Sequence, residues 1–150
     1  MAIRTADAEW RGTLAQGAGH MRLGSGAFDG PYDFRSRMGD GKGTNPEELL
    51  GAAHAGCYSM ALALQLANAG LAVDRIHTTA KVHFEEREGD WSIQRIDLNT
   101  EAWLSDVVIS DATVATFAEQ AQIAKKNCPV SRALSGVDIH LSAKVARAAA

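Results

Sequence analysis

The two cysteines are the residues of this chain with the clearest potential for chemistry. Cys57 lies within Leu49–Val73, a stretch of 25 residues without Asp, Glu, Lys or Arg, and Cys128 lies much later, directly before Pro129. A thiolate attacks electrophiles whereas a thiol hardly does, so a reactive cysteine needs a nearby cation, a helix amino terminus or a base. Thiol chemistry is therefore the first hypothesis, and each cysteine has to meet that requirement.

The local settings of the two cysteines differ. Cys128 lies at or beside the start of a short helix predicted at 129–134, and Lys125, Lys126 and Arg132 are close to it in sequence. Cys57 lies in the middle of a predicted helix among alanines, where a free cysteine is commonly a small core residue. Local electrostatics alone therefore favours Cys128 as the nucleophile. If Cys57 reacts, another part of the fold must supply its cation.

Two arginines are candidates for that cation. Apolar and polar side chains alternate over residues 32–38, which predicts a strand with Arg35 and Arg37 on one face. Glu47 or Glu48, at the start of the next helix, could hold a guanidinium in a forked geometry. An arginine fixed in this way is a rigid cation that can point at sulfur.

The spacing of Glu47 and Cys57 constrains how such a site is built. Ten residues of straight helix separate these side chains by about 15 Å and by roughly a quarter turn. Either the helix breaks near Gly51, or the glutamate and arginine reach the cysteine from a second subunit. This constraint makes a dimer the simpler interpretation, and the small residues Ala52, Ala53, Ala55 and Gly56 offer a face suited to close helix packing.

The elements that position these residues make an α+β domain, which we expect to span residues 1–150 as a single unit. The predicted order is glycine-punctuated strands within 6–38, a loop at 39–44, a helix from Asn45 to Gly70, strands at 75–86 and 91–103, a helix at 111–126, a short helix at 129–134 and a strand at 137–145. On the 111–126 helix, the inward residues are predicted to be Val114, Phe117, Ala118, Ala121 and Ala124.

Composition narrows the class of protein. The chain has 46% hydrophobic and 22% charged residues and a formal net charge of -3, which is typical of a soluble globular protein and argues against nucleic-acid binding. Residues 1–7 lack the apolar core of a signal peptide, so we expect a cytoplasmic protein. The charge-free stretch is long enough for a membrane span, but His54, Gln65 and Asn68 within it favour a buried helix and no membrane.

A metal site is the main alternative use of these side chains. His54 and Cys57 share a helix face at a spacing of three residues and could seed a zinc site with Cys128. Two or three ligands fall short of a closed tetrahedron. We therefore expect no metal. We interpret His54 as a packed core residue or as a residue that contacts the site residues and not the substrate.

The amino-acid sequence of two segments resembles that of a known family. The run Gly43-Thr44-Asn45-Pro46-Glu47-Glu48-Leu49-Leu50-Gly51-Ala52-Ala53-His54-Ala55-Gly56-Cys57-Tyr58-Ser59-Met60-Ala61-Leu62, followed by Cys128-Pro129-Val130-Ser131, is similar to the osmotically inducible protein C and organic hydroperoxide resistance family (OsmC/Ohr). The match covers nearly the whole chain, and the motifs are more similar to the OsmC branch than to the Ohr branch.

This resemblance implies a fold, a reaction and a set of site residues. It implies antiparallel sheets around a long buried central helix, in an intertwined homodimer with two active sites at the subunit interface. Cys57 matches the family's peroxidatic cysteine and Cys128 its resolving cysteine. Glu47 matches the catalytic glutamate, and Arg37 matches the catalytic arginine better than Arg35, which lies near the same register.

The activity implied by the resemblance is a thiol-dependent peroxidase that acts in oxidative and osmotic stress defence. The resemblance also implies no metal, no bound cofactor and re-reduction by dithiols such as those of lipoylated proteins. Leu50, Met60, Ala61 and Leu64 lie at helical spacing beside Cys57 and favour organic hydroperoxides over hydrogen peroxide. Two other functions stay open: a non-catalytic carrier of a small apolar ligand, and a redox sensor that passes its disulfide to a partner.

Overall fold

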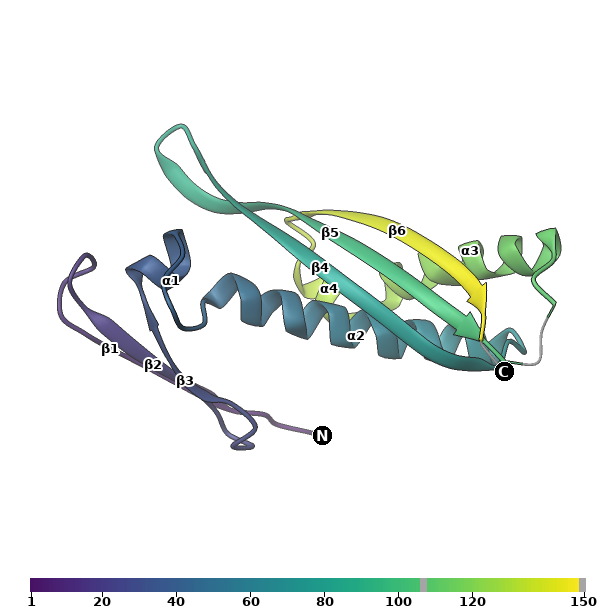
Figure 1. Cartoon of the computed structure of the whole chain (residues 1–150), viewed down its shortest axis with the longest axis horizontal. Helices are drawn as coiled ribbons and strands as arrows, with labels where there is room; N and C mark the ends of the chain where they lie inside the picture. The colour runs from purple at the N-terminus through teal and green to yellow at the C-terminus, as the bar shows by residue number, and fades with distance from the viewer. Residues whose placement is uncertain (106–107, 149–150) are drawn as a thin grey trace. The chain divides into compact units, whose positions relative to one another are not determined.

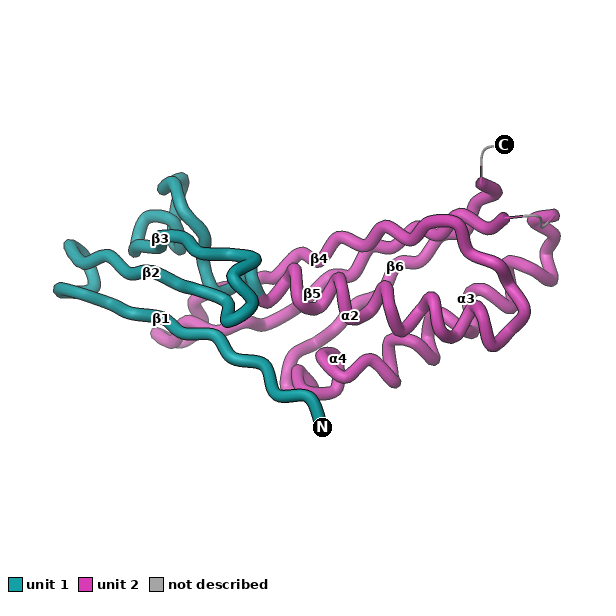
Figure 2. The backbone as a smooth tube through the Cα atoms, turned by 90° about the horizontal axis from the view of Figure 1, so that it is seen from below, with its two compact units in different colours: residues 1–49 teal, residues 50–150 magenta. Residues whose placement is uncertain are grey.

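The computed structural model describes residues 1–105 and 108–148, which form two compact units, residues 1–49 and residues 50–150 (Figure 2). The elements are β1 (Ala6–Arg11), β2 (Ala18–Leu23), β3 (Asp29–Asp33), α1 (Phe34–Met38), α2 (Pro46–Asn68), β4 (Val73–Arg87), β5 (Asp90–Leu104), α3 (Asp111–Asn127), α4 (Pro129–Ala133) and β6 (Asp138–Arg147). The α+β class is confirmed. That residues 1–150 act as one domain stays a prediction.

The first unit is a small antiparallel sheet followed by one helical turn. Strands β1, β2 and β3 pair in sequence order. The predicted strand over residues 32–38 is wrong beyond Asp33, because a capping box starts α1 there. The Asp33 carboxylate accepts a hydrogen bond from the backbone N–H of Ser36 at 2.7 Å, and the Ser36 hydroxyl accepts one from the Asp33 backbone N–H at 2.9 Å.

Helix α2 begins and ends where its sequence signals predict. The Asn45 side chain accepts a hydrogen bond from the Glu48 backbone N–H at 2.8 Å, with Pro46 at the first helical position. At the other end Gly70 takes φ +73°, a conformation that favours glycine, and the Leu71 N–H donates to the Leu66 carbonyl. The helix is continuous from Pro46 to Asn68, so the alternative of a break near Gly51 is wrong.

The second unit holds a three-stranded sheet in the order β4-β5-β6 (Figure 1). Strands β4 and β5 form the predicted hairpin, with Glu88 and Gly89 at positive φ in the turn. The expectation of purely antiparallel sheets is wrong for one pair, because β6 lies parallel to β5. That pairing follows from the connection: α3 and α4 carry the chain back along the sheet before β6 begins.

The core of the second unit lies between one face of this sheet and the helices. Alternate residues of β5 are buried against side chains from α2 and α3, and the fully enclosed members are Tyr58, Leu62, Leu66, Ile96, Leu98, Ala102, Leu104, Phe117, Ala121, Ala124 and Cys128. On α3 the prediction holds for Phe117, Ala121 and Ala124. Val114 and Ala118 are exposed instead, because the buried stripe of this short helix is narrower than the apolar pattern.

Helix α2 is buried along only one face of this chain, so the expectation of a fully buried helix is wrong for the single subunit. Gly51, His54, Tyr58, Leu62 and Leu66 form its buried stripe. The opposite face is exposed, with Met60 at 77% and Leu64 at 59% of their maximal accessibility. Within the described residues α2 alone is long and apolar enough to cross a membrane by length and composition. Its buried stripe is that of a core helix.

Candidate active site

The structure brings the two cysteines together inside the second unit. Cys57 projects from the middle of α2, and Cys128 lies at the junction where α3 ends and α4 begins. Their sulfur atoms are 3.1 Å apart, and both are free thiols. Cys57 is half-buried, whereas Cys128 is fully buried. A short movement of either side chain would bring the two sulfurs to bonding distance, about 2.05 Å.

The amino end of α4 acts on both sulfurs, with opposite results. Burial raises the pKa of the Cys57 thiol, and the Val130 backbone N–H opposes this, while neighbouring Cys128 adds to the rise. Burial alone would also raise the pKa of Cys128. Hydrogen bonds from the Ser131 backbone, Cys57, the Ser131 hydroxyl and the Val130 backbone outweigh burial and lower it. Within this unit a negative charge is therefore more stable on Cys128 than on Cys57.

The first unit holds the predicted ion pair between arginine and glutamate. Arg37 on α1 and Glu47 in the first turn of α2 form a forked contact, in which Arg37 Nη2 lies 2.7 Å and Nε 3.1 Å from Glu47 Oε1. The Glu47 side chain is only 10% exposed and the Arg37 side chain 41%. A bidentate contact of this kind fixes the plane of the guanidinium, as a cation directed at a reactive group requires.

The helical turn of α1 separates the two candidate arginines. Residues two apart lie about 200° apart around a helix, so Arg35 and Arg37 do not share a face, contrary to the strand prediction. Arg37 faces Glu47. Within the described part of the chain Arg35 forms no ion pair, and its side chain lines open hollows with Phe34. The geometry therefore favours Arg37 as the fixed cation. Glu48 contacts the Thr44 hydroxyl instead.

A histidine and a serine lie directly behind the cysteines. His54, one turn before Cys57 on α2, is fully buried, and its Nε2 lies 2.8 Å from the Ser131 hydroxyl oxygen. Ser131 in turn acts on Cys128, as its effect on that thiol pKa shows. The sequence predicts His54 near the site but indicates no role for Ser131. The available signal was the position of Ser131 three residues after Cys128, one turn of α4 away.

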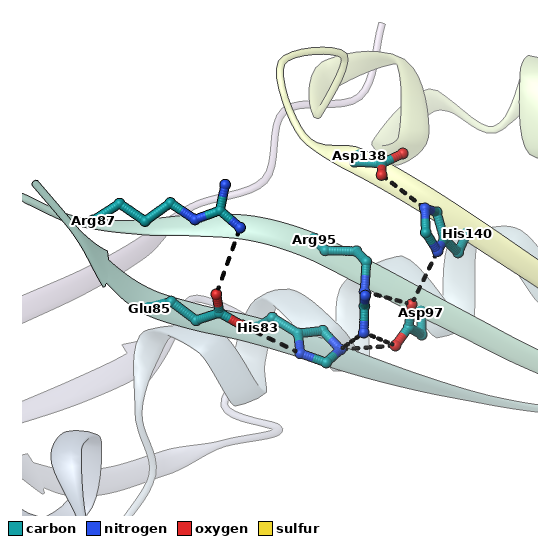
Figure 3. Close-up of polar contacts among 7 residues, drawn as sticks. All are labelled: His83, Glu85, Arg87, Arg95, Asp97, Asp138 and His140. Carbon is teal, nitrogen blue, oxygen red and sulfur yellow. Dashed lines mark hydrogen bonds and ion pairs between the residues drawn. The ribbon is translucent and has the colours of Figure 1, made fainter.

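A second cluster of ionisable side chains lies on the sheet, on the face opposite the core (Figure 3). Asp97 on β5 contacts His83 on β4 at 2.7 Å and Arg95 at 3.0 Å, and its other neighbour, His140 on β6, pairs with Asp138. A hydrogen bond from His83 lowers the pKa of Asp97, and the charge of Arg95 adds to this effect against the opposing effect of burial. Over residues 1–105 and 108–148 no group of three or more His, Cys, Asp or Glu side chains could hold a metal ion.

Comparison with known proteins places the chain in a family. Residues 39–142 match the family of OsmC-like proteins. The chain is 41% identical over 128 residues to Peroxiredoxin OsmC of Escherichia coli, which covers 85% of this chain and 86% of that protein.

Solved structures give the same result. The organic hydroperoxide resistance protein OhrB of Bacillus subtilis superposes with a TM-score of 0.65 and 27% identity, over 93% of this chain and 98% of that one. An OsmC-like protein of unknown function from Vibrio cholerae superposes with a TM-score of 0.74 and 14% identity over 95% and 99%, which supports the fold alone. With the family match over most of its length and the close pair of cysteines in its core, the chain belongs to the OsmC-like protein family.

Proposed function

We propose that this protein reduces organic hydroperoxides at Cys57 and resolves the product as a Cys57–Cys128 disulfide. At the level of activity class the chain is a thiol-dependent peroxidase, as its relatives named peroxiredoxin are. The observation that carries the finer proposal is the 3.1 Å separation of two free sulfurs in the core of the second unit. A structural pair of core cysteines has no need for such an approach or for hydrogen bonds from a helix end.

The reaction proceeds in two balanced steps. The Cys57 thiolate attacks the distal oxygen of the hydroperoxide, so that an S–O bond forms, the O–O bond breaks and the alkoxide leaves as an alcohol after taking a proton. The Cys128 thiolate then attacks the Cys57 sulfur, so that the S–S bond forms and hydroxide leaves as water. A dithiol, such as a lipoyl group on a protein, returns both cysteines to thiols.

Arg37 and Glu47 supply the charge that Cys57 needs. Because burial raises the pKa of Cys57, its thiolate requires a cation close to sulfur. Glu47 holds the guanidinium of Arg37 by the forked contact, which makes Arg37 suited to this role. Helix α2 is unbroken between Glu47 and Cys57, a rise of about 15 Å. We therefore assign the arginine and glutamate of each site to the second subunit of a homodimer.

The exposed face of α2 supports a second copy as the partner. Met60 and Leu64 are large apolar side chains left uncovered on one helix, and Ala53 and Gly56 beside them are small and exposed. Covering such a face removes apolar surface from water at about 25 cal/mol per Å². A symmetric contact between two α2 helices uses the same patch on both subunits. It would bring the helices that carry Cys57 together.

The apolar side chains beside Cys57 also favour organic hydroperoxides as the substrate class. Met60, Ala61 and Leu64 lie on the side of α2 that carries Cys57, so a hydrocarbon group attached to the peroxide finds apolar contacts there. Hydrogen peroxide has no such group and gains nothing from them. This activity fits a cytoplasmic enzyme of peroxide and osmotic stress defence. In the carrier alternative the same surface binds an apolar ligand and Cys57 is only packing.

Peroxide consumption with dithiothreitol tests the proposal. The wild type should consume cumene hydroperoxide with a higher kcat/KM than hydrogen peroxide, and Cys57→Ser should lose both activities. Cys128→Ser is the matched control, because it should still consume one equivalent of peroxide per subunit in the first turnover. Equal efficiency with both peroxides would refute the substrate preference. Full activity in Cys57→Ser would refute the assigned nucleophile.

A further inference from the structure

The His54–Ser131 contact is a buried polar pair that the two reaction steps above do not use. His54 is 0% exposed and Ser131 is 7% exposed, and the pair joins α2 to α4 within the second unit. Burying an imidazole is unfavourable unless its polar atoms are satisfied. Such a group is maintained at a cost in stability, so it calls for a function.

The surroundings of His54 determine its protonation. Burial lowers the pKa of His54, which keeps the imidazole neutral near neutral pH. Its Nδ1 is buried and has no hydrogen-bond partner within the described residues. A bare ring nitrogen tolerates this better than an N–H, because an N–H would be an unsatisfied buried donor. The arrangement therefore favours the tautomer with the proton on Nε2.

This tautomer makes the Ser131 oxygen an acceptor and so determines that the hydroxyl proton does not point at His54. When His54 Nε2–H donates to the Ser131 oxygen across 2.8 Å, the hydroxyl proton of Ser131 is free to point elsewhere. Ser131 lies in the first turn of α4, whose N-cap is Cys128, and a hydrogen bond from its hydroxyl is among the causes that lower the pKa of that thiol. The chain of contacts runs from His54 through Ser131 to Cys128, and from Cys128 to Cys57 at 3.1 Å.

We propose that His54 is a positioning residue for the resolving step, holding the Ser131 hydroxyl as a donor to the Cys128 thiolate. The inference rests on the proposed function, because disulfide formation is the step that it serves. His54 touches neither sulfur in this role and takes no proton. With Cys128 as the thiolate, attack on the Cys57 sulfenic acid releases hydroxide, which takes its proton from solvent and leaves as water.

Other ionisable groups near Cys128 can also influence its titration. Cys57 and Tyr58 reach it from α2, and the pKa of Tyr58 is raised by burial and by a charge on Cys128. Lys126 at the end of α3 and Arg132 on α4 are exposed to solvent. All of these remain in the variants below except Cys57, so a change in titration on altering His54 or Ser131 is assigned to the relay.

The decisive experiment titrates the Cys128 thiolate by its absorbance near 240 nm in a Cys57→Ser background, which needs no peroxide. Adding Ser131→Ala or His54→Leu should raise the pKa of Cys128 by about one pH unit, as expected for loss of one charge-assisted hydrogen bond. His54→Gln, which keeps an N–H donor near the Nε2 position, should restore most of the shift. Ser59→Ala is the matched control, because Ser59 makes an equally short 2.8 Å contact to Thr78, away from the sulfurs.

The link to the reaction is tested with both cysteines present. Stopped-flow reaction with cumene hydroperoxide should show unchanged sulfenic acid formation in Ser131→Ala and disulfide formation about tenfold slower at pH 7, recovering at higher pH. An unchanged Cys128 titration in both Ser131→Ala and His54→Leu would overturn the inference, and Ser131→Ala decides alone if His54→Leu does not fold. A wild type inert to peroxide would refute the proposed function while the titration still tests the relay.

Discussion

Subunit mixing tests whether Arg37 serves the Cys57 of the partner chain. As pure proteins, Cys57→Ser should be inactive and Arg37→Ala should lose most of its activity. In Arg37→Ala the site loses a charge-assisted contact to the thiolate worth about 1.5–3 kcal/mol, or a loss of about 10- to 150-fold in the first step. In Cys57→Ser the nucleophile is missing. If the arginine acts across the interface, a mixed dimer regains one complete site.

The magnitude follows from the symmetry of a dimer. Random exchange of equal amounts of the two variants makes about half of the dimers mixed, and each mixed dimer has one complete site of two. The mixture should therefore recover about one quarter of wild-type activity. The assay is dithiol-dependent consumption of cumene hydroperoxide, with exchange verified by two different affinity tags.

Arg35→Ala is the matched control for this experiment, since Arg35 lies two residues away on α1 and forms no ion pair among the described residues. It should keep activity within about twofold of wild type, because a single exposed charge changes little. A mixture that exchanges subunits but stays inactive would refute the assignment across subunits. Loss of activity in Arg35→Ala with activity kept in Arg37→Ala would refute the choice of arginine.

Three further predictions follow from the structure. Leu64→Glu places a charge on the exposed face of α2 and should convert the dimer to monomers in analytical ultracentrifugation, whereas Val114→Glu on α3, also exposed, should not. Leu62→Ala removes a fully buried side chain and should lower the free energy of unfolding by about 2–5 kcal/mol in urea titrations, so a loss below 1 kcal/mol would contradict the core described above. His83 and Arg95 lower the pKa of Asp97, so its contribution to stability is present above the ordinary carboxyl pKa and is lost as pH falls through the lowered value. Asp97→Asn should therefore reduce the fall in the free energy of unfolding on the acid side. An unchanged dependence of that free energy on pH would refute the contribution.

Much of the fold could be predicted from local sequence signals. The Asn45 cap with Pro46 started α2 where expected, and Gly70 ended it. The turn at Glu88-Gly89 set the β4–β5 hairpin. The error at residues 34–38 has a clear cause: five alternating residues fit a strand, but Asp33 and Ser36 also form a capping box, and the hydrogen bonds of that box decided for a helix.

The site was predictable in part, where chemistry depends on residue type. Residue types singled out the two cysteines and left Arg35 or Arg37 and Glu47 or Glu48 open, the resemblance to a family selected Arg37 and Glu47, and the roles of all four site residues stay predictions. The extent to which α2 is exposed within one subunit was not predicted, because a run such as Leu49–Val73 shows apolar character but not how much of the helix the same subunit covers. The Ser131 contact to His54 joins residues far apart in the chain, and no local pattern encodes such a contact.

The central claim is that Cys57 and Cys128 form a disulfide as a direct product of peroxide reduction. The most direct test adds one equivalent of cumene hydroperoxide to the reduced protein, quenches within seconds with an alkylating agent and maps the cysteine peptides by mass spectrometry. We predict a Cys57–Cys128 disulfide in nearly every chain, absent from Cys57→Ser, with Cys57 trapped as a sulfenic acid in Cys128→Ser. Recovery of both cysteines as alkylated thiols, with the peroxide unconsumed, would contradict this prediction.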